Sequence, residues 1–118
     1  MRALDHPSQG SISLPAVLAA LSDPARLDVV RQLAASGGVV CGQFDALEHV
    51  SMSTLSHHLK VLRTAGVIHV EQRGKFRQHE LRADDLESRF PGVLASVVAT
   101  FGLDLPTSAD RTEPVLSR

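Results

Sequence analysis

The sequence lacks features that several classes of protein require. Its 118 residues contain one cysteine, Cys41, so no disulfide can close within the chain and no site of several thiolates can form in one copy. No apolar run approaches the roughly 18 residues of a membrane-spanning helix. The first residues, MRALDHPSQGS, carry charges, a proline and a glycine where a secretory signal has an apolar stretch. We therefore expect a single cytoplasmic domain with no membrane partner.

The motifs of common enzyme classes are also missing. The chain has no G-x-S-x-G nucleophile turn and no glycine-rich loop that could hold a phosphate. No catalytic motif places a histidine beside Cys41. The acidic residues Asp84, Asp85 and Glu87 are typical of a helix start, where the helix dipole favours carboxylates. We therefore expect no enzyme, no catalytic residues and no cofactor.

The charge of the chain is small but unevenly distributed. The net charge is −1, whereas a basic balance is the usual sign of a nucleic-acid partner. Residues 57–82 nevertheless hold six Lys or Arg and two Glu, a net charge of +4, while residues 1–56 carry −2 and residues 83–118 carry −3. This middle segment indicates a local phosphate-binding surface. Charge alone leaves a solvated charged face as an equal alternative.

Two helices are expected in the first third of the chain. Ser13 can cap the first, which has a proline in its first turn and apolar residues at the i, i+3, i+4, i+7 spacing of one buried stripe. Ser22 or Asp23 can cap the second, which again has a proline in its first turn. The glycine pair at 37–38 ends this second helix.

The centre of the chain predicts a helix-turn-helix followed by a hairpin. A short helix is expected within residues 42–50, and Ser51 can cap a second helix that stops at Gly66. Two helices separated by about three residues are consistent with a helix-turn-helix. The apolar period then changes from 3.6 toward 2 on both sides of Gly74-Lys75. This change predicts a β-hairpin with basic residues at its tip.

The last part of the chain predicts one more helix. In residues 83–101, Pro91 separates a short acidic turn from a helix whose apolar stripe is wide enough to favour a partner helix over a small core. The fold class is therefore mainly α with a small β-hairpin, a winged helix-turn-helix of order α-α-α-α-β-β-α. We expect a flexible N-terminal arm at 1–12, one domain at 13–102 and a disordered tail at 103–118.

The helix expected after Ser51 separates its side chains by type. A rotation of about 100° per residue places one apolar arc inward, formed by Met52, Leu55, Leu59 and Leu62. The opposite side carries hydroxyl, imidazole and ammonium groups and no carboxylate: Ser53, Thr54, His57, Lys60 and Thr64. Such groups can donate to phosphate oxygens and base edges. For this helix alone, a solvated polar face is the better interpretation; the ordered helix, turn, capped helix and basic hairpin favour nucleic acid.

The adjacent histidines in this helix do not face each other. Neighbours in sequence point in different directions around a helix, so His57 falls on the polar side and His58 on the flank nearer the core. The pair therefore cannot form a close i, i+4 chelating site. We interpret His57 as a DNA-facing residue and His58 as a packing residue.

Three strings, LSDPARLDVVRQL, STLSHHLKVLRTAGVI and RGKFRQHEL, resemble the ArsR/SmtB (arsenical-resistance) type of winged-helix transcriptional repressors, over roughly residues 14–101. The resemblance implies a homodimer, built largely from the first and last helices, that binds an imperfect inverted repeat in double-stranded DNA with half-sites about 34 Å apart. The helix after Ser51 would enter the major groove and the hairpin would follow the backbone as a wing. With Lys60 on the same polar face, the implied DNA contacts are Ser53, Thr54, Ser56, His57, Arg73, Lys75 and Arg77.

The usual metal ligands of the family are not carried over. Val40-Cys41-Gly42-Gln43 stands where metal-responsive members typically have Cys-x-Cys, and residues 84–101 contain no histidine. We therefore expect no metal site of the usual kind, and the sequence does not identify an effector. A redox or metal switch at Cys41 is an alternative, for instance through an intersubunit disulfide, against a buried inert thiol. Another alternative is a protein-interaction module, against which the charged helix face argues.

Overall fold

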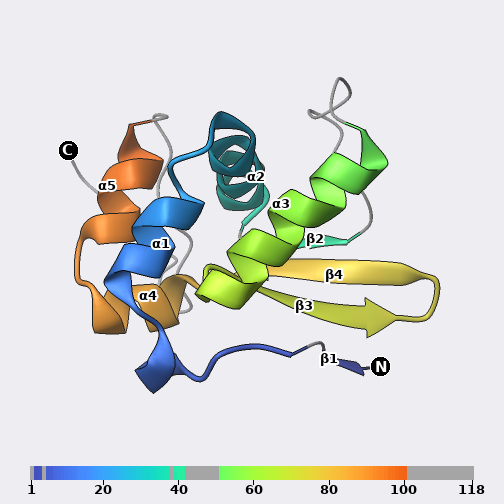
Figure 1. The fold of residues 1–118 in the computed structure, drawn as a ribbon, viewed down its shortest axis with the longest axis horizontal. Coiled ribbons are helices and arrows are strands. Elements are labelled where there is room, and N and C mark those ends of the chain that lie inside the picture. The colour runs from blue at the N-terminus through green and yellow to red at the C-terminus, as the bar shows by residue number, and fades with distance from the viewer. Residues whose placement is uncertain (1, 4, 38, 42–50, 101–118) are drawn as a thin grey trace.

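The computed structural model describes residues 2–3, 5–37, 39–41 and 51–100, with side chains for 5–37 and 51–100. Among these residues the fold is mostly helical with an antiparallel hairpin (Figure 1), which confirms the predicted class. The helix predicted within 42–50 and the tail at 103–118 lie outside the described residues. The elements are β1 (Arg2–Ala3), η1 (Gln9–Ser11), α1 (Leu14–Ala20), α2 (Pro24–Ala35), β2 (Val39–Cys41), α3 (Met52–Ala65), β3 (Ile68–Arg73), β4 (Phe76–Leu81), α4 (Ala83–Arg89) and α5 (Val93–Ala99).

The long helices begin where a side chain accepts hydrogen bonds from the first turn. Ser13 caps α1 and Ser51 caps α3, each accepting from the N–H three residues later at 3.2 Å. The Asp23 carboxylate caps α2, accepting from the Ala25 N–H at 2.8 Å. Each cap satisfies a donor that has no partner inside the helix. These three helix starts confirm predictions made from local sequence.

The sheet has two more described strands than the expected hairpin. Its order is β1-β3-β4-β2, and every neighbouring pair is antiparallel. β1 pairs with β3 through Arg2 opposite Gln72, and β2 pairs with β4 through Cys41 opposite Gln78. Strands of two and three residues are too short to show a period of 2 in the sequence, which is why they were not predicted.

The N-terminal arm lies against the hairpin in the structure, although the sequence predicts a flexible segment. β1 extends the sheet at the edge of β3 (Figure 1). Ile12, at the end of the arm, is 1% exposed. Hydrogen bonds also join the arm to other elements, among them Arg63 Nη1 to the Asp5 carbonyl at 2.7 Å, Val70 N–H to His6 Nε2 at 2.9 Å, and Arg82 Nη1 to the Pro7 carbonyl at 2.9 Å. All three partners are 58 or more positions away in the chain, so local patterning could not indicate them.

Helix α3 crosses the core and is positioned by α1, α2 and β3. Leu55 and Leu62 are buried, and Leu59 packs against the core from its edge, as the helical periodicity predicts. The prediction for Met52 was wrong, because its side chain is 61% exposed. Met52 lies in the first turn, at the end of α3 farthest from α1 (Figure 1). The apolar arc is therefore buried only where the helix crosses the core.

Helix α3 ends at a glycine that serves two purposes. Gly66 has φ +90°, a left-handed conformation that side-chain-bearing residues rarely adopt. A Cβ at this position would lie 2.6 Å from Cγ1 of the buried Ile12. Gly66 is therefore required both by the backbone turn and by the close approach of the N-terminal arm.

Candidate nucleic-acid interface

The polar residues predicted on α3 share an exposed surface. The side chains of Ser53, Thr54, Ser56, His57 and Lys60 are all exposed. Two of the hydroxyls are tied to the helix cap, since Ser51 Oγ lies 2.9 Å from Thr54 Oγ1 and 3.3 Å from Ser53 Oγ. This network positions the hydroxyls at the N-terminal end of the helix, while His57 and Lys60 extend the polar surface along it.

The two histidines of α3 point in different directions, as predicted. His57 is exposed, whereas His58 is 9% exposed, and their ring planes are tilted by 51°. Arg26 Nη1 lies 3.1 Å from His58 Nδ1. A guanidinium only donates, so Nδ1 is the acceptor in this contact. His58 thus connects α3 to the start of α2.

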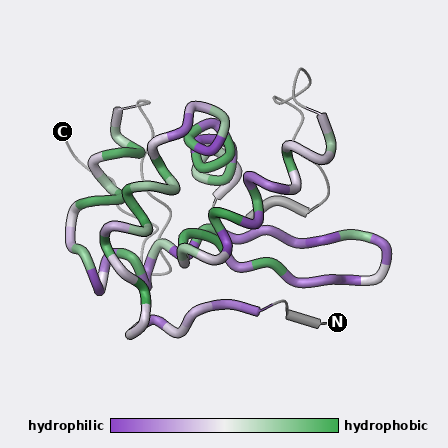
Figure 2. Tube along the Cα trace, in the orientation of Figure 1, coloured by the Kyte–Doolittle hydropathy of each residue, from purple (hydrophilic) through white to green (hydrophobic). Residues whose placement is uncertain are grey.

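The cations of the hairpin are exposed, but they are not equivalent. Lys75 lies in the turn beside Gly74, which has φ +62°. Arg73 Nη2 donates to the Glu71 carboxylate at 3.2 Å, so a negative charge already faces this guanidinium. Arg77 Nε instead donates to the neutral Gln72 amide oxygen at 3.2 Å. Figure 2 shows hydrophilic residues along most of the hairpin, in contrast to the helices at the other end of the molecule.

A small cavity lies between α3 and the hairpin. Its volume is about 50 Å³. The described residues that line it are Ser56, Leu59, Lys60, Arg63, Val70, Arg77 and His79. Sequence analysis did not single out Arg63, although it lies one helical turn after Lys60, a spacing that puts both side chains on the same part of the helix surface. It also did not single out His79, which is 4% exposed.

Phe76 was also not singled out. It is 60% exposed and lies in β4 directly after the turn, opposite Arg73. Phe76 is an exposed large apolar side chain in a strand whose other exposed residues are polar. The sequence pattern that could have identified Phe76 is an aromatic residue between two basic ones, Lys75 and Arg77.

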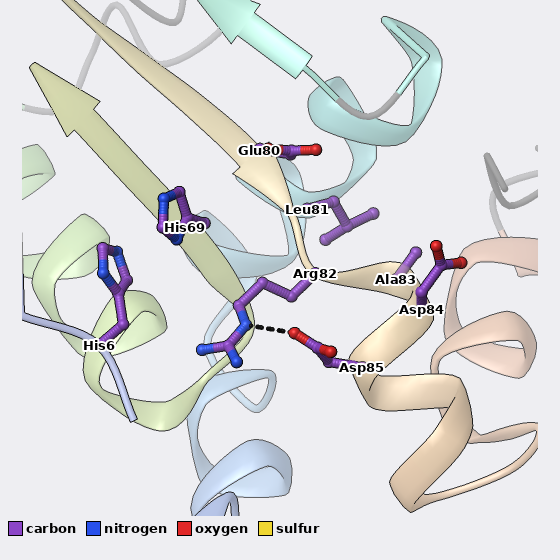
Figure 3. Close-up of a pocket in the computed structure, with 8 residues that line it drawn as sticks. All are labelled: His6, His69, Glu80, Leu81, Arg82, Ala83, Asp84 and Asp85. Carbon is purple, nitrogen blue, oxygen red and sulfur yellow. Dashed lines mark hydrogen bonds and ion pairs between the residues drawn. The ribbon is translucent and has the colours of Figure 1, made fainter. Parts of the chain in front are cut away.

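A larger cavity, of about 510 Å³, lies between the N-terminal arm, the hairpin and the start of α4 (Figure 3). The rings of His6 and His69 stack with centroids 4.1 Å apart. Figure 3 shows these rings on one side of the cavity and Asp84 on the other, with the Arg82–Asp85 ion pair of 2.9 Å between them. Among the described residues, no group of three or more His, Cys, Asp or Glu side chains is arranged to hold a metal ion.

The backbone of Cys41 lies in β2, while its side chain is outside those described. The redox-switch hypothesis therefore stays a prediction. In the part of the chain that the structure describes, no helix has the length and apolar character needed to cross a bilayer.

A capped helix with an exposed polar face, set beside a basic β-hairpin, defines a winged helix-turn-helix of the DNA-binding class. Comparison with known proteins supports this assignment to the helix-turn-helix class. A helix-turn-helix domain model matches residues 21–71. The chain is 32% identical over 82 residues to the HTH-type transcriptional regulator YceK of Bacillus subtilis, a match that covers 69% of this chain and 82% of that protein.

Two further relatives match a shorter part of the chain. The HTH-type transcriptional repressor SmtB of Mycobacterium tuberculosis is 42% identical over 59 residues, which is 50% of this chain and 43% of that protein. An HTH-type transcriptional regulator of Methanocaldococcus jannaschii is 36% identical over 59 residues, 49% of this chain and 65% of that protein. The chain belongs to the ArsR/SmtB type of helix-turn-helix transcriptional regulators. It is a DNA-binding regulator, and its relatives are named as regulators of transcription.

Proposed function

We propose that this protein is a dimeric repressor that binds an inverted-repeat operator in double-stranded DNA. The observation that carries the proposal is the exposed face of α3, which presents hydroxyl, imidazole and ammonium groups beside a basic hairpin on one surface. The name of the relative SmtB, a transcriptional repressor, supports repression. A repressor of this kind acts in the cytoplasm, where we place the protein.

The division of DNA contacts follows from side-chain chemistry. On α3, which enters the major groove, we assign base-edge and nearby phosphate contacts to five residues: Ser53, Thr54, Ser56, His57 and Lys60. On the hairpin, which lies along the backbone, we assign phosphate contacts to Arg73, Lys75 and Arg77. Groove contacts determine sequence preference, while phosphate contacts supply affinity that depends on salt.

Dimerisation would use α1 and α5. Both helices lie at the end of the molecule opposite the hairpin tip (Figure 1), so pairing there leaves both wings at the outside of the dimer. Leu18 of α1 is 50% exposed, a large apolar side chain without full burial in the monomer. Two copies related by a two-fold axis would present two α3 helices to successive major grooves, which matches an inverted repeat.

The test is a binding titration with DNA from upstream of the protein's own gene and with a scrambled fragment of equal length, at several salt concentrations. We expect preference for the upstream fragment and an affinity that falls steeply with salt. Analytical ultracentrifugation of the free protein should show a dimer. Binding that is indifferent to both sequence and salt would contradict the proposal, and a monomer that binds one half-site would contradict its dimeric part.

A further inference from the structure

The small cavity between α3 and the hairpin has the size and charge of a phosphate site. Its volume of about 50 Å³ is room for a few water-sized groups, which is too small for an organic effector but enough for the exposed oxygens of one phosphate group. α3 contributes Lys60 and Arg63 to its walls, and β4 contributes Arg77. No described residue that lines it is acidic.

The alternation of side chains in the hairpin keeps its carboxylates away from this cavity. In the β3–β4 register, Gln72 is opposite Arg77 and Val70 is opposite His79, and these pairs lie on the sheet face toward α3. Because successive side chains point to opposite faces of a strand, Glu71 and Glu80 lie on the other face. Glu80 accordingly lines the larger cavity with His69 (Figure 3). The face of the hairpin toward α3 therefore carries Arg77 and no carboxylate, while the opposite face carries Glu71 and Glu80.

Two of the three cations are held by neutral acceptors. Arg63 Nη1 donates to the Asp5 backbone carbonyl at 2.7 Å, and Arg77 Nε donates to the Gln72 amide oxygen at 3.2 Å. A guanidinium has five N–H donors, so one such bond positions the group and leaves the other donors and the full charge for a ligand. By contrast, Arg73 faces a carboxylate, that of Glu71. Arg63 and Arg77 are thus pre-positioned without being neutralised.

We propose that this cavity binds one phosphate group of the DNA backbone, which Lys60, Arg63 and Arg77 hold together. The inference rests on the proposed function and adds Arg63 to the interface. In the proposed complex α3 lies in the major groove and the hairpin lies along the DNA backbone. The cavity between these two elements would then lie beside a backbone phosphate. Three cations from two elements around one anion also fix the angle between α3 and the wing in the complex, because charge-assisted hydrogen bonds are directional.

The test uses the full chain and a random-sequence duplex, so that phosphate contacts are measured without base recognition. Arg63→Gln and Arg77→Gln remove the charge and keep a polar side chain, and each is expected to weaken binding roughly tenfold. The double variant should lose less than the product of the two single losses, since both groups act on one ligand. Arg31→Gln, which removes a cation paired with Asp28 on α2, is the matched control for net charge and should change affinity less than twofold.

Two results would overturn the proposal: losses for both variants no larger than that of R31Q, or losses that multiply without coupling. Circular dichroism and thermal melting check that each variant is folded. If R63Q fails to fold because its bond to the arm is lost, R77Q and K60Q provide the same pair test with exposed side chains.

A second measurement distinguishes between two possible ligands of the cavity, a phosphate of the DNA backbone and a small phosphate compound. Inorganic phosphate is titrated into the wild type at constant ionic strength, with chloride as the reference, while the Nε–H signals of Arg63 and Arg77 are followed by NMR. Selective shifts with phosphate, together with unchanged DNA affinity of the variants, would assign the cavity to a small phosphate compound and overturn the DNA assignment. If the wild type binds no duplex, the proposed function is refuted instead. The phosphate titration would still show whether the cavity binds phosphate.

Discussion

Arg26 and His58 form a side-chain contact between the start of α2 and the buried side of α3. Arg26 Nη1 lies 3.1 Å from His58 Nδ1, and Arg26 Nε donates to the Ala20 carbonyl at 2.7 Å. One guanidinium at the start of α2 therefore binds the C-terminal end of α1 and the buried imidazole of α3.

Replacing Arg26 by Gln should lower the stability of the domain. A buried acceptor on His58 and a carbonyl at the end of α1 would lose their donor, at a cost of about 1–3 kcal/mol in the free energy of unfolding. Urea denaturation measures the change. Arg31→Gln is the control, because its ion pair with Asp28 is partly exposed to solvent and should contribute about 0–1 kcal/mol. Equal losses in both variants would contradict a special role for Arg26.

The cap of α2 predicts a pH dependence. Burial raises the pKa of Asp23, but hydrogen bonds from the Ala25 and Arg26 N–H groups and attraction to His58 and Arg26 outweigh it, so the pKa is lowered from its ordinary 3.8. The carboxylate therefore contributes stability that is present above pH 3.8 and lost as the pH falls through the lower folded-state value. Asn also caps helices well, so Asp23→Asn should keep the helix and reduce the slope of stability against pH below 3.8. An unchanged slope in thermal melts at pH 2–4 would count against this assignment.

The groove and wing residues should differ in what their loss does to DNA binding. Lys75→Ala removes a phosphate contact, so it should weaken binding to all sequences and reduce the salt slope by about 1. His57→Ala should chiefly relax discrimination between the upstream fragment and a scrambled one. Fluorescence anisotropy with both fragments at several salt concentrations makes the comparison. Identical effects of the two variants on both fragments would contradict the assignment.

Gly66→Ala should be more destabilising than Gly37→Ala. Both glycines have positive φ, +90° and +78° respectively, so each substitution incurs a backbone cost of about 1 kcal/mol. Only at Gly66 would the new Cβ also meet another side chain, Ile12, at 2.6 Å, whereas nothing lies within 4 Å at Gly37. We expect an additional cost of about 1–3 kcal/mol at Gly66, measured by urea denaturation. Shortening Ile12 to Ala in the G66A background should recover part of that additional cost, and no recovery would mean that the clash is not its source.

Much of the fold was predictable because its signals are local. Caps at Ser13, Asp23 and Ser51 involve groups two or three residues apart, and the hairpin shows a period that changes at a glycine. The separation of His57 from His58 needs only the geometry of a helix. The exposed polar face of α3 was predictable for the same reason, since its residues follow one another along one helix.

The sequence by itself determined where α1, α2 and α3 begin, that α3 ends at Gly66, that a basic hairpin follows α3, and that the hydroxyl, imidazole and ammonium groups of α3 face outward. Only the tertiary structure decided that Met52 is exposed, that the arm lies against the sheet, that Arg26 reaches His58 across 32 positions, and that Arg63 and Arg77 share a cavity. The physical reason is the range of the interactions. Capping and periodicity act within a few residues, whereas a contact between distant residues exists only once packing has placed their backbones side by side.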